Sequence, residues 1–238
     1  MTAKKSNKNS LYELIFNIVL PVILLSKLSD KFGDKGPLIA LCVALSFPIG
    51  YFLWDWISSK HVSIISILGF VNILLTGCFA LFELNSFWFA VKEASIPLAI
   101  GIGIVSTVFT AKPLVKRFLS NRDIINVDLI EEQLLDADVS AKFDRELKIL
   151  TLYFASTFLA SAILNFIVTT NIVIEIPPEI TDAARLKIRN EQIADLTWKS
   201  YIVILAPSMV MLSFIMWRAN FIIKKYTGLS LDKLIIQK

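Results

Sequence analysis

The sequence predicts an all-α, polytopic membrane helix bundle with about six transmembrane helices and both termini in the cytoplasm. Three observations lead to this fold class. Hydrophobic residues make up 55% of the 238 residues and charged residues only 18%, against about 25% charged in an ordinary soluble domain. The apolar residues come in long unbroken runs, and lysine and arginine are distributed unevenly between the segments that separate these runs. We therefore expect a single integral membrane domain over residues 1–238.

Each apolar run has the length of one membrane-spanning helix. The runs hold about 17 to 23 residues, or roughly 26 to 35 Å as helix, which matches a hydrocarbon layer near 30 Å. A transmembrane barrel would need shorter segments of alternating polarity. Because lipid offers no hydrogen bonds to the backbone, helices are the remaining choice. The predicted spans are residues 11–28, 38–54, 62–84, 94–111, 149–170 and 201–223.

The first run follows a polar, positively charged start that contains Lys4, Lys5 and Lys8. Such a start is typical of a signal peptide, but the residues after the run lack a small-x-small cleavage site. We therefore predict an uncleaved first span. Ser10 and Glu13 have the spacing of a capping box at its start.

The distribution of basic residues predicts the orientation. With six spans, one side of the membrane holds 16 of the 24 lysine and arginine residues, if Arg218 near the end of the last span is included. Basic residues favour the cytoplasmic side, so both termini and the loop 112–148 are predicted to be cytoplasmic and the loop 171–199 external. The first loop, with Lys27, Lys31 and Lys35, weakly opposes this orientation.

Two loops are long enough to contain structure of their own. Val127, Ile130, Leu134 and Leu135 recur at roughly helical spacing in the cytoplasmic loop, which predicts a short amphipathic helix at the membrane interface. In the external loop, a polar helix of mixed charge is expected over 181–196, after Pro177 and Pro178. This helix could continue directly into the last span.

Charged side chains at the ends of several spans are candidate contact residues. Lys27 and Asp30 have i, i+3 spacing and share a helix face if the first helix continues that far. Together with Glu83, Lys92 and Glu93 they are predicted to lie on the outer side. Such a group could pair between helices or bind a polar headgroup. The plainer alternative is that each side chain reaches the interface separately.

Other polar or kinking residues lie within the predicted spans. Asn17, Asn72 and Asn165 are at mid-span in three helices, where an amide is most often structural and bonds to another helix. The runs also contain prolines, which either mark broken helices around a cavity or are tolerated packing kinks. These prolines are Pro21, Pro48, Pro97 and Pro207.

The residue types needed for familiar catalysis or metal binding are not grouped in this sequence. His61 is the single histidine, so a Ser-His-Asp constellation has no base in reach. Cys42 and Cys78 fall inside apolar runs and are expected to behave as small hydrophobic residues. We predict no enzyme activity, no cofactor, no metal and no nucleic-acid partner.

The segment from Leu74 to Leu119 carries a family resemblance. Leu81-Phe82, then Phe87 and Lys92, precede a span that ends in the motif Ala111-Lys-Pro-Leu-Val-Lys-Arg-Phe-Leu119. Lys27-x-x-Asp30 and the asparagine-bearing later span also contribute. This pattern resembles the intracellular septation protein A (YciB-like) family of bacterial inner membrane proteins, in a divergent branch. The chain departs from the family in its longer 171–199 segment and in the tail after the last span.

The resemblance implies a non-enzymatic inner membrane protein that acts in envelope synthesis, division or membrane integrity. Its partners would be anionic lipid headgroups and other envelope membrane proteins. The alternative is a small transporter or lipid-handling protein with a cavity near Pro21 and Pro97, and a membrane-embedded enzyme is a third possibility. The candidate lipid- or partner-binding residues are Lys27, Asp30, Lys92, Glu93, Lys112, Lys116 and Arg117.

Overall fold

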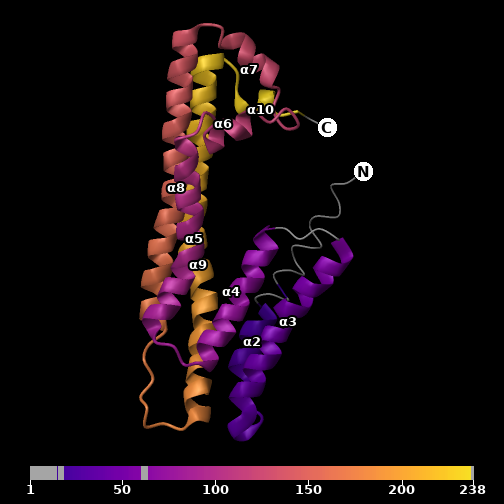
Figure 1. Cartoon of the computed structure of the whole chain (residues 1–238), viewed down its shortest axis with the longest axis vertical. Coiled ribbons are helices and arrows are strands. Elements are labelled where there is room, and N and C mark those ends of the chain that lie inside the picture. The colour runs from indigo at the N-terminus through magenta and orange to yellow at the C-terminus, as the bar shows by residue number, and fades with distance from the viewer. Residues whose placement is uncertain (1–14, 16–18, 60–63, 237–238) are drawn as a thin grey trace. The chain divides into compact units, whose positions relative to one another are not determined.

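The computed structural model describes residue 15 and residues 19–59 and 64–236. The helices within these residues are α-helices, apart from a three-residue 3-10 helix named η2. The described part contains no β-strand, in agreement with the predicted all-α class. In chain order the elements are α2 (Leu20–Leu28), η2 (Gly33–Lys35), α3 (Gly36–Ser59), α4 (Ile64–Leu81), α5 (Ser86–Val108), α6 (Leu114–Leu119), α7 (Val127–Gln133), α8 (Ala137–Ile172), α9 (Asp182–Thr227) and α10 (Leu231–Leu234) (Figure 1).

Four helical segments of the described part are long and apolar enough to cross a membrane. They contain most or all of the predicted spans 38–54, 94–111, 149–170 and 201–223. The other two predicted spans are described only in part. Of span 11–28 the structure describes residue 15 and residues 19–28, and of span 62–84 it describes residues 64–84. The structure is therefore that of a chain with several membrane-length helices, and the number six stays a prediction. The four segments are Gly33–Trp54, Ser86–Val108, Ala137–Ile172 and Asp182–Thr227.

The chain divides into two compact units. Unit 1 contains the described residues up to Ala94 together with Leu164–Val203, and unit 2 contains Ser95–Ile163 and the residues from Ile204 onward. Helices α5, α8 and α9 contribute residues to both units. Because these three helices belong partly to unit 1 and partly to unit 2, the division does not test the prediction of a single membrane domain.

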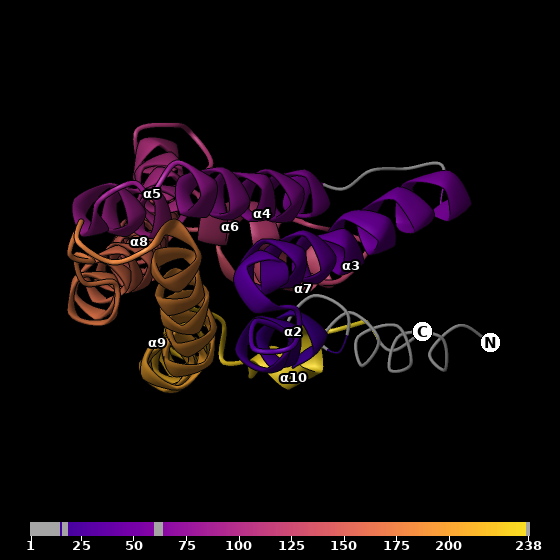
Figure 2. The ribbon, with the colours of Figure 1, turned by 90° about the horizontal axis from the view of Figure 1, so that it is seen from below.

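In unit 1, α3 lies between α2 and α4 (Figure 2). Helices α3 and α4 approach each other closely at Gly77 of α4, where a Cβ atom would displace the terminal methyl group of Leu45 of α3. The buried core of the unit also includes Phe89 of α5, Val173 immediately after α8, and residues of α9. Its members are Leu25, Leu41, Ala44, Ala80, Phe89, Val173, Ile193, Ala194 and Leu196.

In unit 2, α8 and α9 run antiparallel. The Ser161 and Ser208 hydroxyl groups are 3.3 Å apart, while Glu146, earlier in α8, binds Arg218, later in α9. Helix α5 approaches α8 at Gly101, where a Cβ atom would lie 3.2 Å from Leu159 Cδ2. Small residues permit such close contact between apolar helices.

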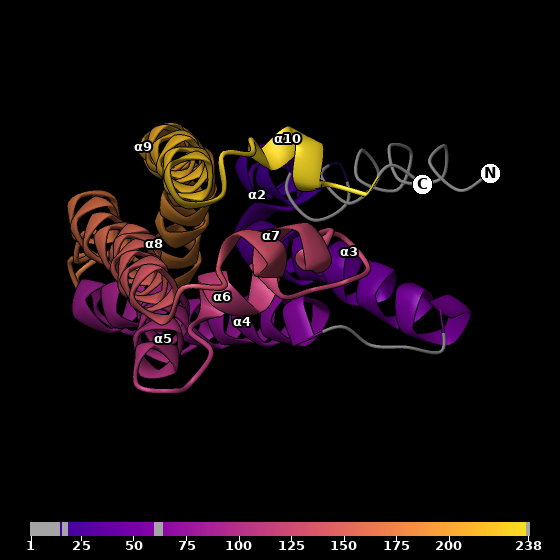
Figure 3. The same cartoon turned by 90° about the horizontal axis from the view of Figure 1, so that it is seen from above.

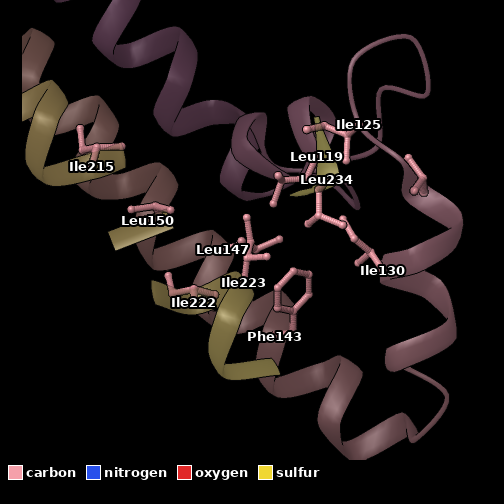
Figure 4. Packing of buried hydrophobic residues seen from close by; sticks show 11 residues of the cluster. Leu119, Ile125, Ile130, Phe143, Leu147, Leu150, Ile215, Ile222, Ile223 and Leu234 are labelled. Carbon is pink, nitrogen blue, oxygen red and sulfur yellow. The ribbon is translucent and has the colours of Figure 1, made fainter. Parts of the chain in front are cut away.

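Three short helices, α6, α7 and α10, gather beside the start of α8 and the end of α9 (Figures 1 and 3). We call this group, with the adjoining ends of α8 and α9, the helical cap. Its apolar side chains point toward one another from all five helices (Figure 4). The fully buried members Ile125, Leu147, Ile223 and Leu234 are among them. A short bridge pairs Ile125 with Ile235, and the Asn126 amide donates to the Leu234 carbonyl at 2.8 Å.

The helical cap corrects the prediction for residues 112–148. This segment is not an open loop, since it contains α6, α7 and the first residues of α8. The predicted amphipathic helix is present as α7, but its apolar residues Val127 and Ile130 are buried in the protein core rather than facing a membrane surface. Leu135, which we had included in the same apolar pattern, is 87% exposed.

The helix expected over 181–196 is also present, and it does continue into the last span. Helix α9 has 46 residues, which corresponds to about 69 Å at 1.5 Å per residue. Its first half carries mixed charge, as expected, but it is not exposed on all sides, because Arg189, Asn190 and Leu196 are buried in unit 1.

Candidate functional site

The first half of α9 places polar side chains inside unit 1. Arg189 is 3% exposed and Asn190 is fully buried. Their apolar neighbours Ile193 and Leu196 belong to the unit 1 core. Arg189 and Asn190 lie on the same face of α9 as these two residues and are therefore buried with them. We call this group the α9 polar seat. It consists of Arg185, Lys187, Arg189, Asn190 and Gln192.

The neutral members of the seat donate hydrogen bonds to backbone carbonyl groups and to one side-chain hydroxyl group from distant parts of the chain. Asn190 Nδ2 donates to the Pro37 carbonyl at 2.8 Å and to Ser29 Oγ at 3.2 Å. Gln192 Nε2 donates to the Ile174 carbonyl at 3.2 Å. The segment between α2 and α3 and the segment after α8 therefore meet at the first half of α9.

Two ion pairs join the seat to the ends of α2 and α4. Lys187 Nζ is 2.5 Å from Asp30 Oδ1, and Arg185 Nη2 binds Glu83 Oε2. Both pairs are partly exposed, so each one contributes little by itself. Their effect is to fix which helix ends face α9.

Glu83 has an unusual backbone conformation. Its φ is 48°, the left-handed region, and it follows the last turn of α4. Leu84 N donates to the Phe79 carbonyl at 3.0 Å and Glu83 N to the Ala80 carbonyl at 3.2 Å, which is the Schellman pattern that ends many helices. Glycine is the usual residue at this position, so a glutamate here bears a conformational cost in exchange for a carboxylate beside Arg185.

Arg189 lies deeper in unit 1 and has no carboxylate within ion-pair distance in the described part of the chain. Its Nη1 donates to Gln192 Oε1 at 2.8 Å, and its Nη2 makes a long contact of 3.4 Å with the Leu84 carbonyl. The guanidinium carbon lies 5.2 Å from the centre of the Phe89 ring, and Nε has no acceptor. Burial of an ion costs several kcal/mol, and a desolvated cation–π contact returns about 2 kcal/mol or more of this.

Lys92 is a second buried cation in unit 1. Its ammonium group is 2.6 Å from Glu93 Oε1 and 2.5 Å from Thr76 Oγ1 of α4. The amine therefore points into the protein, which excludes for Lys92 the alternative that it reaches separately toward the interface. Lys27 is exposed, and because α2 ends at Leu28 it does not share a helix face with Asp30.

The predicted basic residues after α5 lie in unit 2 and differ in their surroundings. Lys116 points toward α8 and pairs with Asp144 at 2.5 Å. Lys112 and Arg117 are exposed, and Arg117 Nε donates to the Lys112 carbonyl at 2.8 Å. Two exposed aromatic side chains, Phe109 and Phe118, flank them in the sequence.

The ends of α8 and α9 add further charges to unit 2. Glu146 accepts from Arg218 at 3.0 Å and from Lys225 at 3.4 Å, so one carboxylate serves two cations. In the tail, the Ser230 hydroxyl and then the Asp232 amide hold the pKa of Asp232 below its ordinary value. The cap is thus closed by polar contacts as well as apolar ones.

The predicted structural residues lie as follows. Asn72 and Asn165 are half-buried in α4 and α8, and Asn17 lies outside the described residues. Helices α3, α5 and α9 continue without a break across their prolines. Pro21 is in the first turn of α2 as described. The structure therefore does not show a broken helix at Pro48, Pro97 or Pro207.

Sequence reasoning missed the α9 polar seat. The prediction of a polar helix of mixed charge over 181–196 leaves out the weak apolar stripe formed by Leu186, Ile193 and Leu196. Residues 186, 189, 190, 193 and 196 recur at three- and four-residue spacing, which marks one helix face. The polar character of Arg189 and Asn190 within that stripe concealed it.

Within the described residues, no group of histidine, cysteine, aspartate and glutamate is arranged to hold a metal ion. Comparison of the chain with protein-family models, with curated proteins and with solved structures found no significant match. The resemblance to the septation protein A family stays a prediction.

Proposed function

We propose that the chain is a multi-span protein of the bacterial inner membrane that acts through contacts with anionic lipids and other membrane proteins rather than by catalysis. Its long apolar helices are those of a membrane protein. The envelope role, in synthesis, division or membrane integrity, follows from the resemblance of residues 74–119 to the septation protein A family.

The contacts of the α9 polar seat support six spans. Six spans would put the segments after α2, after α4 and after α8 on one side of the membrane. Asp30, Glu83 and Ile174 come from these three segments, and each binds the first half of α9. If only the four longest apolar helices crossed the membrane, the segment after α2 would lie on the opposite side from α9's first residues.

The observation that supports the lipid-contact proposal is the composition of residues 109–117, which follow α5 and which we call the α5 exit. Lys112 and Arg117 are exposed, and Phe109, 86% exposed, ends the apolar helix beside them. Segments that lie at a membrane interface combine basic side chains with exposed apolar ones such as phenylalanine. Basic residues there attract anionic headgroups by about 1 kcal/mol each. Lys116 is an unsuitable contact residue because Asp144 already binds it.

The test removes these two charges. Full-length protein in neutral detergent is titrated with fluorescent phosphatidylglycerol. We expect the Lys112→Gln/Arg117→Gln variant to bind the lipid at this segment about 30-fold more weakly, the equivalent of roughly 2 kcal/mol. A matched control, Lys31→Gln/Lys35→Gln, removes the same charge from exposed positions of unit 1. Equal binding by both variants and the native chain would exclude the lipid component at this exit.

The transporter alternative is favoured by one observation, the buried cations Lys92 and Arg189. Ionisable side chains among apolar helices frequently line substrate pathways. The prolines do not add to this argument, since α5 is unbroken at Pro97.

A further inference from the structure

We propose that Arg185 and Arg189 of the α9 polar seat form a binding site for a phosphate group, supplied by a phospholipid headgroup or by a soluble phosphate ester. This site is distinct from the basic exit of α5, which belongs to unit 2. It depends on the proposed function only in treating the chain as a membrane protein.

The first argument is the charge balance. Arg185 and Arg189 are four residues apart on one helix, so they lie on the same face. Glu83 is paired with Arg185, and the nearby Asp30 is paired with Lys187. Arg189 therefore keeps a positive charge that no carboxylate of the described chain neutralises, at a position that is only 3% exposed. A bound anion would supply the missing negative charge.

The second argument is the set of unused donors. The Nε atoms of both arginines are buried and have no acceptor. In arginine, Nε and a neighbouring Nη form the edge that binds phosphate or carboxylate through two parallel hydrogen bonds. A phosphate group offers several acceptor oxygens, so one group could accept from both arginines. Buried donors without acceptors are unfavourable, so an anion that accepted from both Nε atoms would be stabilised between these arginines.

The third argument concerns the source of the phosphate. The ring of Phe89 lies against Arg189. Its neighbours Trp88 and Phe87 are exposed at the start of the apolar helix α5. Exposed tryptophan at the end of an apolar helix marks the headgroup level of a bilayer. Phospholipid phosphates are therefore the nearest abundant source for Arg189.

The experiment compares three ligands on the full-length protein in neutral detergent, with native mass spectrometry to count bound molecules and measure affinity. The ligands are short-chain phosphatidylglycerol, glycerol 3-phosphate and the matching diacylglycerol without phosphate. We expect phosphatidylglycerol to bind and diacylglycerol not to bind. Glycerol 3-phosphate binding as tightly as the lipid would identify a soluble phosphate ester as the ligand. Equal binding of phosphatidylglycerol and diacylglycerol would overturn the proposal.

Variants then assign the site. Arg189→Gln is expected to weaken phosphate binding at least about tenfold, the loss of one charge-assisted bond. Lys199→Gln removes the same charge from an exposed position of the same helix and is expected to leave binding unchanged. If Arg189→Gln does not fold, Arg189→Lys serves in its place, since it keeps the charge but loses Nε, and a several-fold loss is expected. Native affinity in the folded Arg189 variant, or an equal loss in Lys199→Gln, would overturn the assignment.

The two proposals can be tested separately. The Lys112→Gln/Arg117→Gln variant should still bind phosphate at Arg185 and Arg189, so a negative result for the segment after α5 would not count against the phosphate site, and the reverse also holds.

Discussion

Glu83 forms an ion pair with Arg185 while its backbone adopts an unfavourable conformation. It occupies the left-handed position after α4, with φ of 48°. A residue with a Cβ atom in this region costs roughly 1–2 kcal/mol relative to glycine. Its carboxylate is also the one that holds Arg185. The two effects oppose each other, and they can be separated by substitution.

We predict that Glu83→Gly is less destabilising than Glu83→Ala by about 1 kcal/mol. Both variants lose the ion pair with Arg185, but only glycine relieves the strained backbone. The measurement is thermal unfolding of the purified protein in detergent, followed by circular dichroism. As a control, Glu179→Gly and Glu179→Ala change an exposed residue for which no positive φ is found. Greater stability of Glu83→Ala than of Glu83→Gly would contradict this account of the α4 end.

At the same scale, the sequence located several contact residues without their partners. It placed Asp30 and Glu83 near span ends, and in the structure they follow α2 and α4, whereas Lys92 and Glu93 lie inside α5, which begins at Ser86. It could not assign Lys187 to Asp30, because the two residues are far apart in sequence and only packing brings them together. The burial of Arg189 was unpredictable for the same reason, since an arginine in a mixed-charge stretch is usually solvated.

Among the elements, α10 illustrates structure that depends entirely on packing. It has four residues, too few to form a stable helix in isolation. It is held because Leu234 is fully buried in the helical cap and because the Ile236 amide donates to the Ile124 carbonyl at 2.9 Å. A hydropathy pattern cannot reveal such an element, whereas the long apolar helices α5, α8 and α9 are evident from their runs.

We predict that Leu234→Ala opens the helical cap. Truncation of a fully buried leucine costs about 2–5 kcal/mol, which exceeds what a four-residue helix can supply. Limited trypsin digestion of the purified protein should then cleave at the exposed Arg122, between α6 and α7, several-fold faster than in the native chain. Leu135→Ala, at a site that is 87% exposed, is the control and should leave the cleavage rate unchanged. An unchanged rate in Leu234→Ala would mean that α10 does not hold the cap closed.

For the whole molecule, composition and run length were enough to predict an all-α chain with membrane-length helices. The exact helix limits were not, because α8 and α9 extend well beyond their apolar parts. Helix α8 begins at Ala137 and α9 at Asp182, where polar residues continue the helix through contacts in the cap and in the seat. Hydropathy reports burial in lipid, and it cannot detect helix stabilised by protein contacts outside that layer.

The number of spans gives the last prediction. Asp34 lies in the segment after α2, Asp123 in the segment after α5 and Glu179 in the segment after α8, and all three side chains are exposed. Each is changed to cysteine in a Cys42→Ala/Cys78→Ala background, and intact bacterial cells are treated with a membrane-impermeant maleimide. Six spans with cytoplasmic termini predict labelling at 34 and 179 in intact cells and at 123 only after lysis.

The alternative arrangements give different patterns. If only the four longest apolar helices cross the membrane, position 34 shares a side with 123 and is opposite to 179. That outcome would also contradict the pairing of Asp30 with Lys187 in the folded protein, because Lys187 follows position 179 without an intervening span. Labelling at 123 alone in intact cells would retain six spans but reverse the orientation predicted from the basic residues. The ion pair at Asp30 thus makes the side of the first loop the decisive observation for the whole topology.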